Sequence, residues 1–157
     1  MQLEWLKSGM EPLQDIISFL TKESRTNDVL KKQVIRELIN NLNIFKNAYL
    51  NKVEADVIID MLTNDAYKKA VEGHFKFSKL KKGTIEPYHV YDDRNRKYIG
   101  WNAEKLCDKI DEKIEELRNI KRMSGNTVAG VKNNIPAMLS NLYYRMKLLA
   151  DFIRGPL

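Results

Sequence analysis

The sequence predicts an all-α protein, a single domain over residues 1–157 folded as a bundle of four to six helices with one irregular or β-hairpin excursion around residues 75–101. The first observation behind this prediction is that two long spans, residues 13–72 and residues 101–124, contain neither glycine nor proline. Long spans of this kind, rich in leucine, isoleucine, lysine and glutamate, are typical of helices. The second is that their apolar residues recur every three or four positions, the spacing of one helix face.

Two helices are predicted before residue 51. The first is expected to begin at Glu11-Pro12, because proline is favoured in a first turn, and to end near Ser24. Its apolar face consists of Leu13, Ile16, Ile17 and Leu20. The cluster Thr26-Asn27-Asp28 then offers an N-cap for a longer second helix. The apolar face of that helix consists of Leu30, Val34, Leu38, Leu42, Phe45 and Tyr49.

Two shorter helices are expected before the excursion. A possible break near Asn51 precedes a third helix, whose apolar stripe is formed by Val53, Val57 and Met61 with the adjacent Ile58 and Leu62. This stripe places Asp56 and Asp60 towards the outer face of the helix. A fourth, short piece is expected to start at Asn64-Asp65 and to run towards Gly73.

Helical signals return after Trp101. Asn102 can cap a helix that runs to about Met123, and three ion pairs are expected on its outer face: Lys105 with Asp108, Lys109 with Glu112 and Lys113 with Glu116. The last helix has Pro136 near its start, although a start near Thr127 with Pro136 as a kink is an alternative. Gly155-Pro156 is expected to end it.

The last helix carries apolar residues at the alternating spacing of a coiled-coil seam. With a tyrosine at its margin, this seam is a candidate protein interface made of Leu139, Leu142, Tyr143, Met146, Leu149 and Ile153. Packing of the same residues inside the bundle is the alternative, because only two heptads are present.

The excursion differs from the rest of the chain in composition. Residues 75–101 hold six of the 14 aromatic residues, and seven basic residues against three acidic ones. Cations that contact phosphates and rings that stack on bases are the groups that single-stranded nucleic acid binding requires. The candidate residues for this function are Lys79, Lys81, Lys82, Tyr91, Arg94, Arg96, Lys97 and Tyr98. Alternatively, the rings seal the open end of the bundle and the lysines only solvate the loop. In a third interpretation the same exposed residues contact a protein partner, because tyrosine, tryptophan and arginine are favoured at protein interfaces.

No residue pattern predicts catalysis, a cofactor, a metal site or a small-molecule substrate. The two histidines, His74 and His89, stand apart from any zinc motif, and Cys107 is expected to be a buried, inert thiol. A helical ribonuclease with an Arg-polar-His arrangement would need a histidine after Arg94-Asn95, and none follows.

The composition predicts the cellular compartment of the protein and the class of partner that it binds. No apolar run is long enough to cross a membrane, and the first residues, interrupted by Glu4 and Lys7, lack the apolar core of a signal peptide. A single cysteine favours a reducing compartment, so we expect a cytoplasmic protein. We expect a non-enzymatic protein that acts through a protein partner or as a homo-oligomer, with single-stranded nucleic acid binding as the alternative.

Overall fold

The computed structural model describes residues 13–156, and every regular element within them is a helix, which confirms the predicted all-α bundle. The α-helices are α1 (Leu13–Glu23), α2 (Val29–Asn51), α3 (Ala55–Met61), α4 (Asp65–Glu72), α5 (Ala103–Met123) and α6 (Ile135–Arg154). The expected start of the first helix at Glu11-Pro12 and the segment with Glu4 and Lys7 lie outside the described residues. No helix within residues 13–156 combines the length and the apolar character that crossing a membrane requires.

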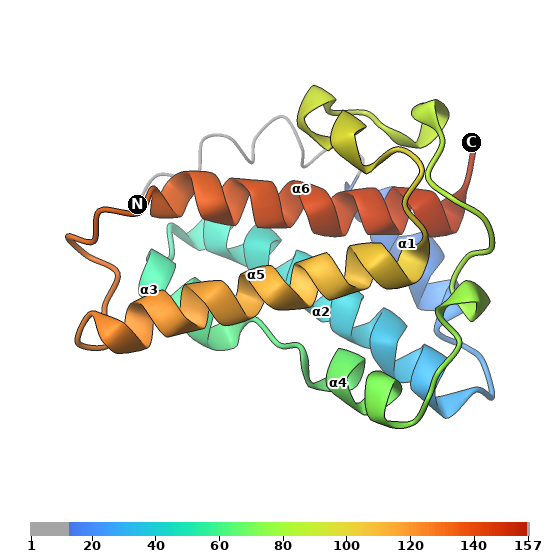
Figure 1. The fold of residues 1–157 in the computed structure, drawn as a ribbon, viewed down its shortest axis with the longest axis horizontal. Helices are drawn as coiled ribbons and strands as arrows, with labels where there is room; N and C mark the ends of the chain where they lie inside the picture. Colours follow the sequence, from blue (N-terminus) through green and yellow to red (C-terminus); the bar gives the residue numbers. More distant parts are fainter. Residues whose placement is uncertain (1–12, 157) are drawn as a thin grey trace.

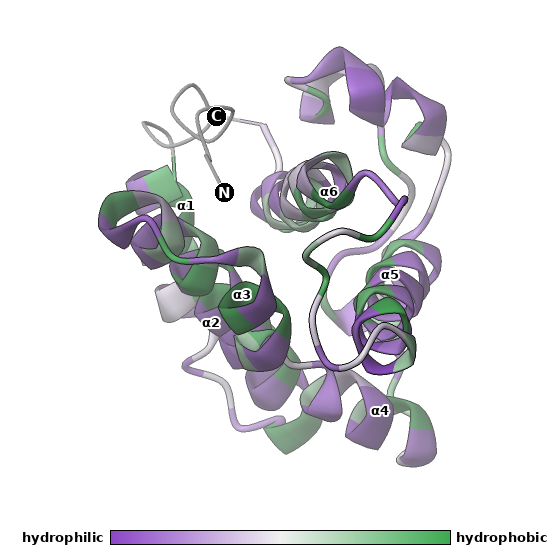
Figure 2. Ribbon diagram, turned by 90° about the vertical axis from the view of Figure 1, so that its left-hand side faces the viewer, coloured by the Kyte–Doolittle hydropathy of each residue, from purple (hydrophilic) through white to green (hydrophobic). Residues whose placement is uncertain are grey.

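Helix α6 lies at the centre of the bundle. In the end-on view it is surrounded by α1, α2, α5 and the excursion (Figure 2). Every residue from Leu142 to Ile153 is buried, so α6 is enclosed on all sides. A helix in this position is normally apolar all round. The sequence predicts a narrow seam instead, because Arg145, Lys147 and Asp151 fall between the apolar positions.

Asparagine and aspartate side chains cap three of the long helices. Asp28 accepts from the backbone N–H of Lys31 at the start of α2, and Asn102 accepts from that of Lys105 at the start of α5. Both caps agree with the sequence prediction. Helix α6 begins at Ile135, with Asn134 as its cap and Pro136 in the first turn, so the alternative start near Thr127 is wrong.

Helix α3 buries only part of its predicted apolar stripe: Ile58 and Leu62 face the core, and Val57 and Met61 do not. Val57 and Met61 are exposed, whereas Ile58, Ile59 and Leu62 are buried. The reason is the carboxylate of Asp56, which accepts from Thr127 Oγ1 at 2.7 Å and from the backbone N–H of Val128 at 2.8 Å. These bonds tie α3 to the α5–α6 loop and turn Asp56 inward, in a helix only two turns long.

The excursion is irregular, and no strand occurs in its residues. It holds three short 3₁₀ helices, η2 (Phe77–Lys79), η3 (Pro87–His89) and η4 (Asp93–Tyr98). The chain loops out past the C-terminal half of α6 and returns to the start of α5 (Figure 1). At its base, Ile85 donates to the carbonyl of Trp101 and Gly100 donates to that of Ile85, each at 2.8 Å. These two bonds close the loop onto itself.

Candidate functional site

Three of the predicted nucleic-acid-binding cations are engaged in the fold. Lys79 pairs with Asp28 at 3.0 Å, and Lys81 Nζ lies against Gly155 at the end of α6. Arg94 donates from Nε to Asp92 at 2.9 Å and from Nη1 to Ser140 Oγ at 2.7 Å. Its guanidinium also stacks 4.2 Å from the centroid of the Tyr144 ring. These contacts fasten the excursion to the bundle.

Other predicted residues are accessible. The side chains of Lys82 and Arg96 are exposed and make no hydrogen bond or ion pair with any other described residue. Tyr88 and Tyr91 are more than half exposed, and they are the exposed large aromatic side chains among residues 13–156. The ammonium of Lys147 lies 5.3 Å from the centroid of the Tyr91 ring and holds it against α6.

Lys97 and Tyr98 meet residues of two other helices in a cleft of about 300 Å³. The cleft lies between the end of η4, α5 and α6; α5 and the excursion lie on the same side of α6 in the end-on view (Figure 2). Its lining consists of Lys97, Tyr98, Lys109, Lys113, Glu116, Leu117, Met138, Asn141 and Arg145. We call this site the basic cleft.

Arg145 is the most enclosed cation of the basic cleft. It is 5 % exposed, and its Nε donates to the Tyr98 hydroxyl at 2.7 Å. The Tyr98 ring is held edge-on by Trp101, with 4.8 Å between centroids. The two Nη atoms of Arg145 find no acceptor among residues 13–156, and they are not among the fully buried atoms. Each therefore keeps some contact with solvent, and Arg145 is part of the cleft lining.

The basic cleft has a strong excess of positive charge. Four cations line it, against the single carboxylate of Glu116, which pairs with Lys113 at 3.0 Å. Lys109 pairs with Glu112 at 3.3 Å, as predicted, whereas Lys105 lies over the Trp101 ring instead of pairing with Asp108. Exposed pairs of this kind contribute little energy. Arg145 has no carboxylate partner among residues 13–156, and an enclosed charge without one is costly.

The predicted protein interface lies inside the bundle. All six of its residues are at most 5 % exposed: Leu139, Leu142, Tyr143, Met146, Leu149 and Ile153. They pack against the other helices of the same chain, for example through the edge-on contact of Tyr143 with Phe45. Within the described chain this seam offers no surface to a partner, and the alternative, internal packing, accounts for it.

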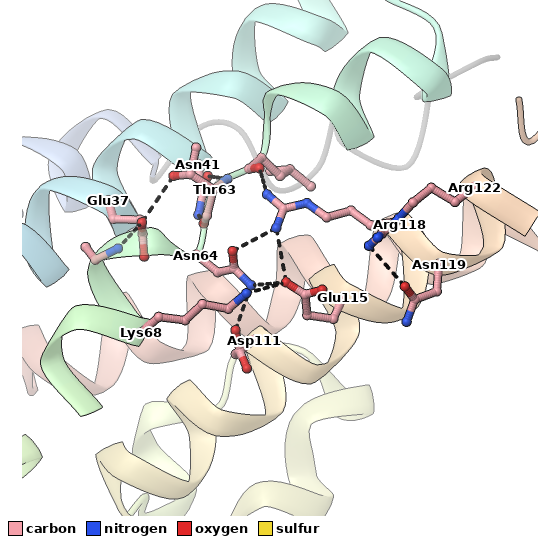
Figure 3. A network of polar contacts seen from close by, with 12 residues as sticks. Glu37, Asn41, Thr63, Asn64, Lys68, Asp111, Glu115, Arg118, Asn119 and Arg122 are labelled. Atoms are coloured by element: carbon pink, nitrogen blue, oxygen red, sulfur yellow. Dashed lines mark hydrogen bonds and ion pairs between the residues drawn. The ribbon is translucent and has the colours of Figure 1, made fainter. Parts of the chain in front are cut away.

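A second polar cluster connects α2, α4 and α5 (Figure 3). The carboxylate of Glu37 accepts from the backbone N–H groups of Ala66 and Tyr67 at the start of α4. One turn further along α2, the amide of Asn41 donates to the Thr63 carbonyl at 2.8 Å and accepts from its N–H at 3.0 Å.

The same cluster continues from Asn64 to α5. The Asn64 amide donates to Asp111 and Glu115 and accepts from Arg118 Nη1. The hydrogen bond from Lys68 is the largest cause that lowers the pKa of Glu115 to about 2. Since these polar groups already bond one another, the cluster holds the α3–α4 connection in place.

A small cavity of about 40 Å³ lies beside this cluster. Glu37, Asp111 and Cys107 line it, and burial raises the pKa of both carboxyl groups. Burial also raises the pKa of the Cys107 thiol to about 12, so the thiolate needed for nucleophilic chemistry is absent at neutral pH.

The histidines and the acidic pair of α3 do not form a common site. His89 is buried and its Nδ1 accepts from the backbone N–H of Glu86 at 2.8 Å, whereas His74 is exposed. Asp60 is exposed and pairs with Lys121 at 2.7 Å, away from the two bonds of Asp56. No group of three His, Cys, Asp or Glu side chains in the described part of the chain is placed to hold a metal ion.

Lys97 and Tyr98 could be identified from the sequence, but the rest of the basic cleft could not. Lys109 and Lys113 belong to ion pairs whose spacing indicates a solvated helix face, and Arg145 falls between positions of the apolar seam. The available signal was a charged residue inside an otherwise apolar helix, since such a residue needs a partner or a function.

Comparison of the chain with models of protein families, with curated proteins and with solved structures finds no match. The basic cleft is therefore interpreted from its own geometry.

Proposed function

We propose that the protein binds single-stranded nucleic acid, with a phosphate group of the strand in the basic cleft. The observation that carries this proposal is the enclosed guanidinium of Arg145, which Tyr98 orients and which pairs with no carboxylate in the described part of the chain. Hydrogen bonds between arginine and phosphate are charge-assisted and bidentate, so a phosphate supplies the missing counter-charge.

Exposed aromatic rings on the excursion support a single strand over a duplex. Tyr88 and Tyr91 are exposed on the excursion that also supplies Lys97. Aromatic side chains beside a basic groove are the usual platform on which unpaired bases stack. Arg96 and Lys82 add unpaired cations to the same excursion. Except for Tyr88, these residues belong to the set that the sequence predicts for this function.

The expectation of a protein partner stays a prediction. The seam on which it was based is buried, and no other described surface favours it over the basic cleft.

The test is fluorescence anisotropy with labelled single-stranded DNA and RNA at increasing salt. We expect binding that weakens steeply between about 50 and 200 mM salt, because each neutralised phosphate releases counterions. The variant Lys97→Ala/Lys109→Ala should bind more weakly and reduce the logarithmic salt slope by about 0.7 for each phosphate that is no longer neutralised.

The matched control is Lys69→Ala/Lys132→Ala, which removes the same charge. Both lysines are exposed and form no ion pair with another described residue. This control should change binding much less than the cleft variant. Equal weakening by both double variants would mean that only net charge matters, and absence of binding at low salt would refute the proposed function.

A further inference from the structure

The charge of the basic cleft exceeds what one internal phosphodiester neutralises. Lys109 and Lys113 pair with Glu112 and Glu116, whereas Arg145 and Lys97 line the cleft without a carboxylate partner among the described residues, which leaves two uncompensated positive charges. An internal phosphodiester carries one negative charge, whereas a phosphate monoester carries about 1.5 to 2 at neutral pH. The cleft is therefore better matched in charge to a monoester.

The enclosure of Arg145 also favours a phosphate monoester over an internal phosphodiester. Its side chain is almost completely enclosed, and the cleft volume of about 300 Å³ is at the small end of ligand sites. An internal phosphodiester carries a sugar on both sides, so both chain directions must leave a narrow site. A terminal phosphate is attached through one ester bond only and can enter end-on.

The Arg145 guanidinium is held ready for such a group. Tyr98 accepts the Nε hydrogen bond, which fixes the plane of the guanidinium and leaves both Nη atoms without a hydrogen-bond partner among residues 13–156. Asn141, which also lines the cleft, accepts a hydrogen bond from Arg94 Nη1 through its Oδ1 at 3.4 Å. The N–H₂ group of the Asn141 amide remains as a further donor. Fixed donors of this kind favour a group with several free oxygens.

We propose that the basic cleft recognises a terminal phosphate monoester of a nucleic acid strand, with Arg145 as its bidentate ligand and Tyr98 as the positioning residue. This inference rests on the proposed function and specifies which phosphate enters the cleft.

The experiment compares three labelled oligonucleotides of one sequence: with a 5′-phosphate, with a 3′-phosphate, and with hydroxyl groups at both ends. We expect one of the phosphorylated strands to bind roughly tenfold or more tightly than the hydroxyl strand, because added hydrogen bonds to a charged group are worth that factor. Inorganic phosphate should reduce this preference by competition.

Two variants test the roles of the residues. Tyr98→Phe keeps the ring but removes the acceptor of Arg145 Nε, so the affinity for the phosphorylated strand should fall more than the affinity for the hydroxyl strand, and the preference should shrink. Arg145→Lys keeps the charge but not the fork, and should abolish most of the preference. Circular dichroism spectra and melting curves identify a variant that fails to fold; Tyr98→Phe then decides, since it changes one oxygen atom.

Each outcome separates the two proposals. Equal affinity of the wild type for all three strands would refute the monoester inference and leave the proposed function standing. A preference that Tyr98→Phe and Arg145→Lys both leave intact would place the monoester elsewhere and overturn the assignment. Displacement of the strand by a phosphoserine peptide of equal affinity would contradict recognition of nucleic acid in particular.

Discussion

Asn41 provides a direct test of how the α3–α4 connection is held. It is 3 % exposed, and its amide donates to the Thr63 carbonyl and accepts from the Thr63 N–H. Asn41→Ala removes both bonds, each worth about 1 kcal/mol. It also leaves two backbone groups without a partner, and a buried unsatisfied group adds about 1 kcal/mol or more. We therefore expect Asn41→Ala to lower the free energy of unfolding by about 2–4 kcal/mol.

The adjacent residue is the matched control. Asn40 is exposed on α2, and its side chain makes no hydrogen bond with another described residue. Alanine is a better helix former than asparagine, so Asn40→Ala should be neutral or stabilise by a few tenths of a kcal/mol. The assay is urea unfolding followed by circular dichroism, with equal slopes in all variants. A loss at Asn41 no larger than the change at Asn40 would refute the reasoning.

Three further predictions concern titration and reactivity. The pKa of His89 lies below its usual value of 6.5 in the folded protein, mainly because of burial. As the pH falls below about 6.5, the unfolded chain therefore binds a proton more readily than the folded protein, and the free energy of unfolding should decrease. His89→Asn should remove this loss in a stability–pH profile, whereas the exposed His74→Asn should keep it. Glu115, whose pKa is lowered from 4.5 to about 2, contributes stability that is present above pH 4.5 and lost as pH falls towards 2. Glu115→Gln should flatten the profile in that range, and an unchanged slope would contradict the role of Lys68. Cys107, buried and with its pKa raised to about 12, should react with a thiol reagent only after unfolding in urea; rapid reaction of the native protein would disprove its burial.

The presence of the helices and their N-cap residues could be predicted because both depend on residues that are close in sequence. Asp28 and Asn102 lie within three residues of the N–H groups that they bond, so the sequence alone shows both partners. The face of α3 could not be predicted in the same way, because Asp56 is turned inward by Thr127 and Val128, which are distant in sequence.

The polar cluster of α2 could not be predicted for the same reason. Glu37 caps α4 through the N–H groups of Ala66 and Tyr67, which lie about 30 residues further along the chain. Nothing within one helical turn of Glu37 indicates those partners.

The candidate site could be predicted in part. A count of basic and aromatic residues identifies the excursion, and Lys97 and Tyr98 do line the basic cleft. The same count cannot separate them from Lys79 and Arg94, which bond to the bundle. Arg145 could not be identified from the sequence, because the spacing of apolar residues on α6 indicates one buried face, whereas the helix is enclosed on all sides.

The two hydrogen bonds that join Ile85 to Gly100 and Trp101 have an evolutionary consequence. These bonds bring the two ends of residues 85–101 together, so exposed positions of this segment that bond to nothing in the described bundle, such as Arg96, can be substituted or extended without moving the start of α5. The entropy of closing a loop rises slowly with its length, about 0.6 kcal/mol for each doubling, so such changes cost little. The bundle is thus a fixed scaffold, and the exposed positions of this loop are the ones at which sequence change is tolerated best.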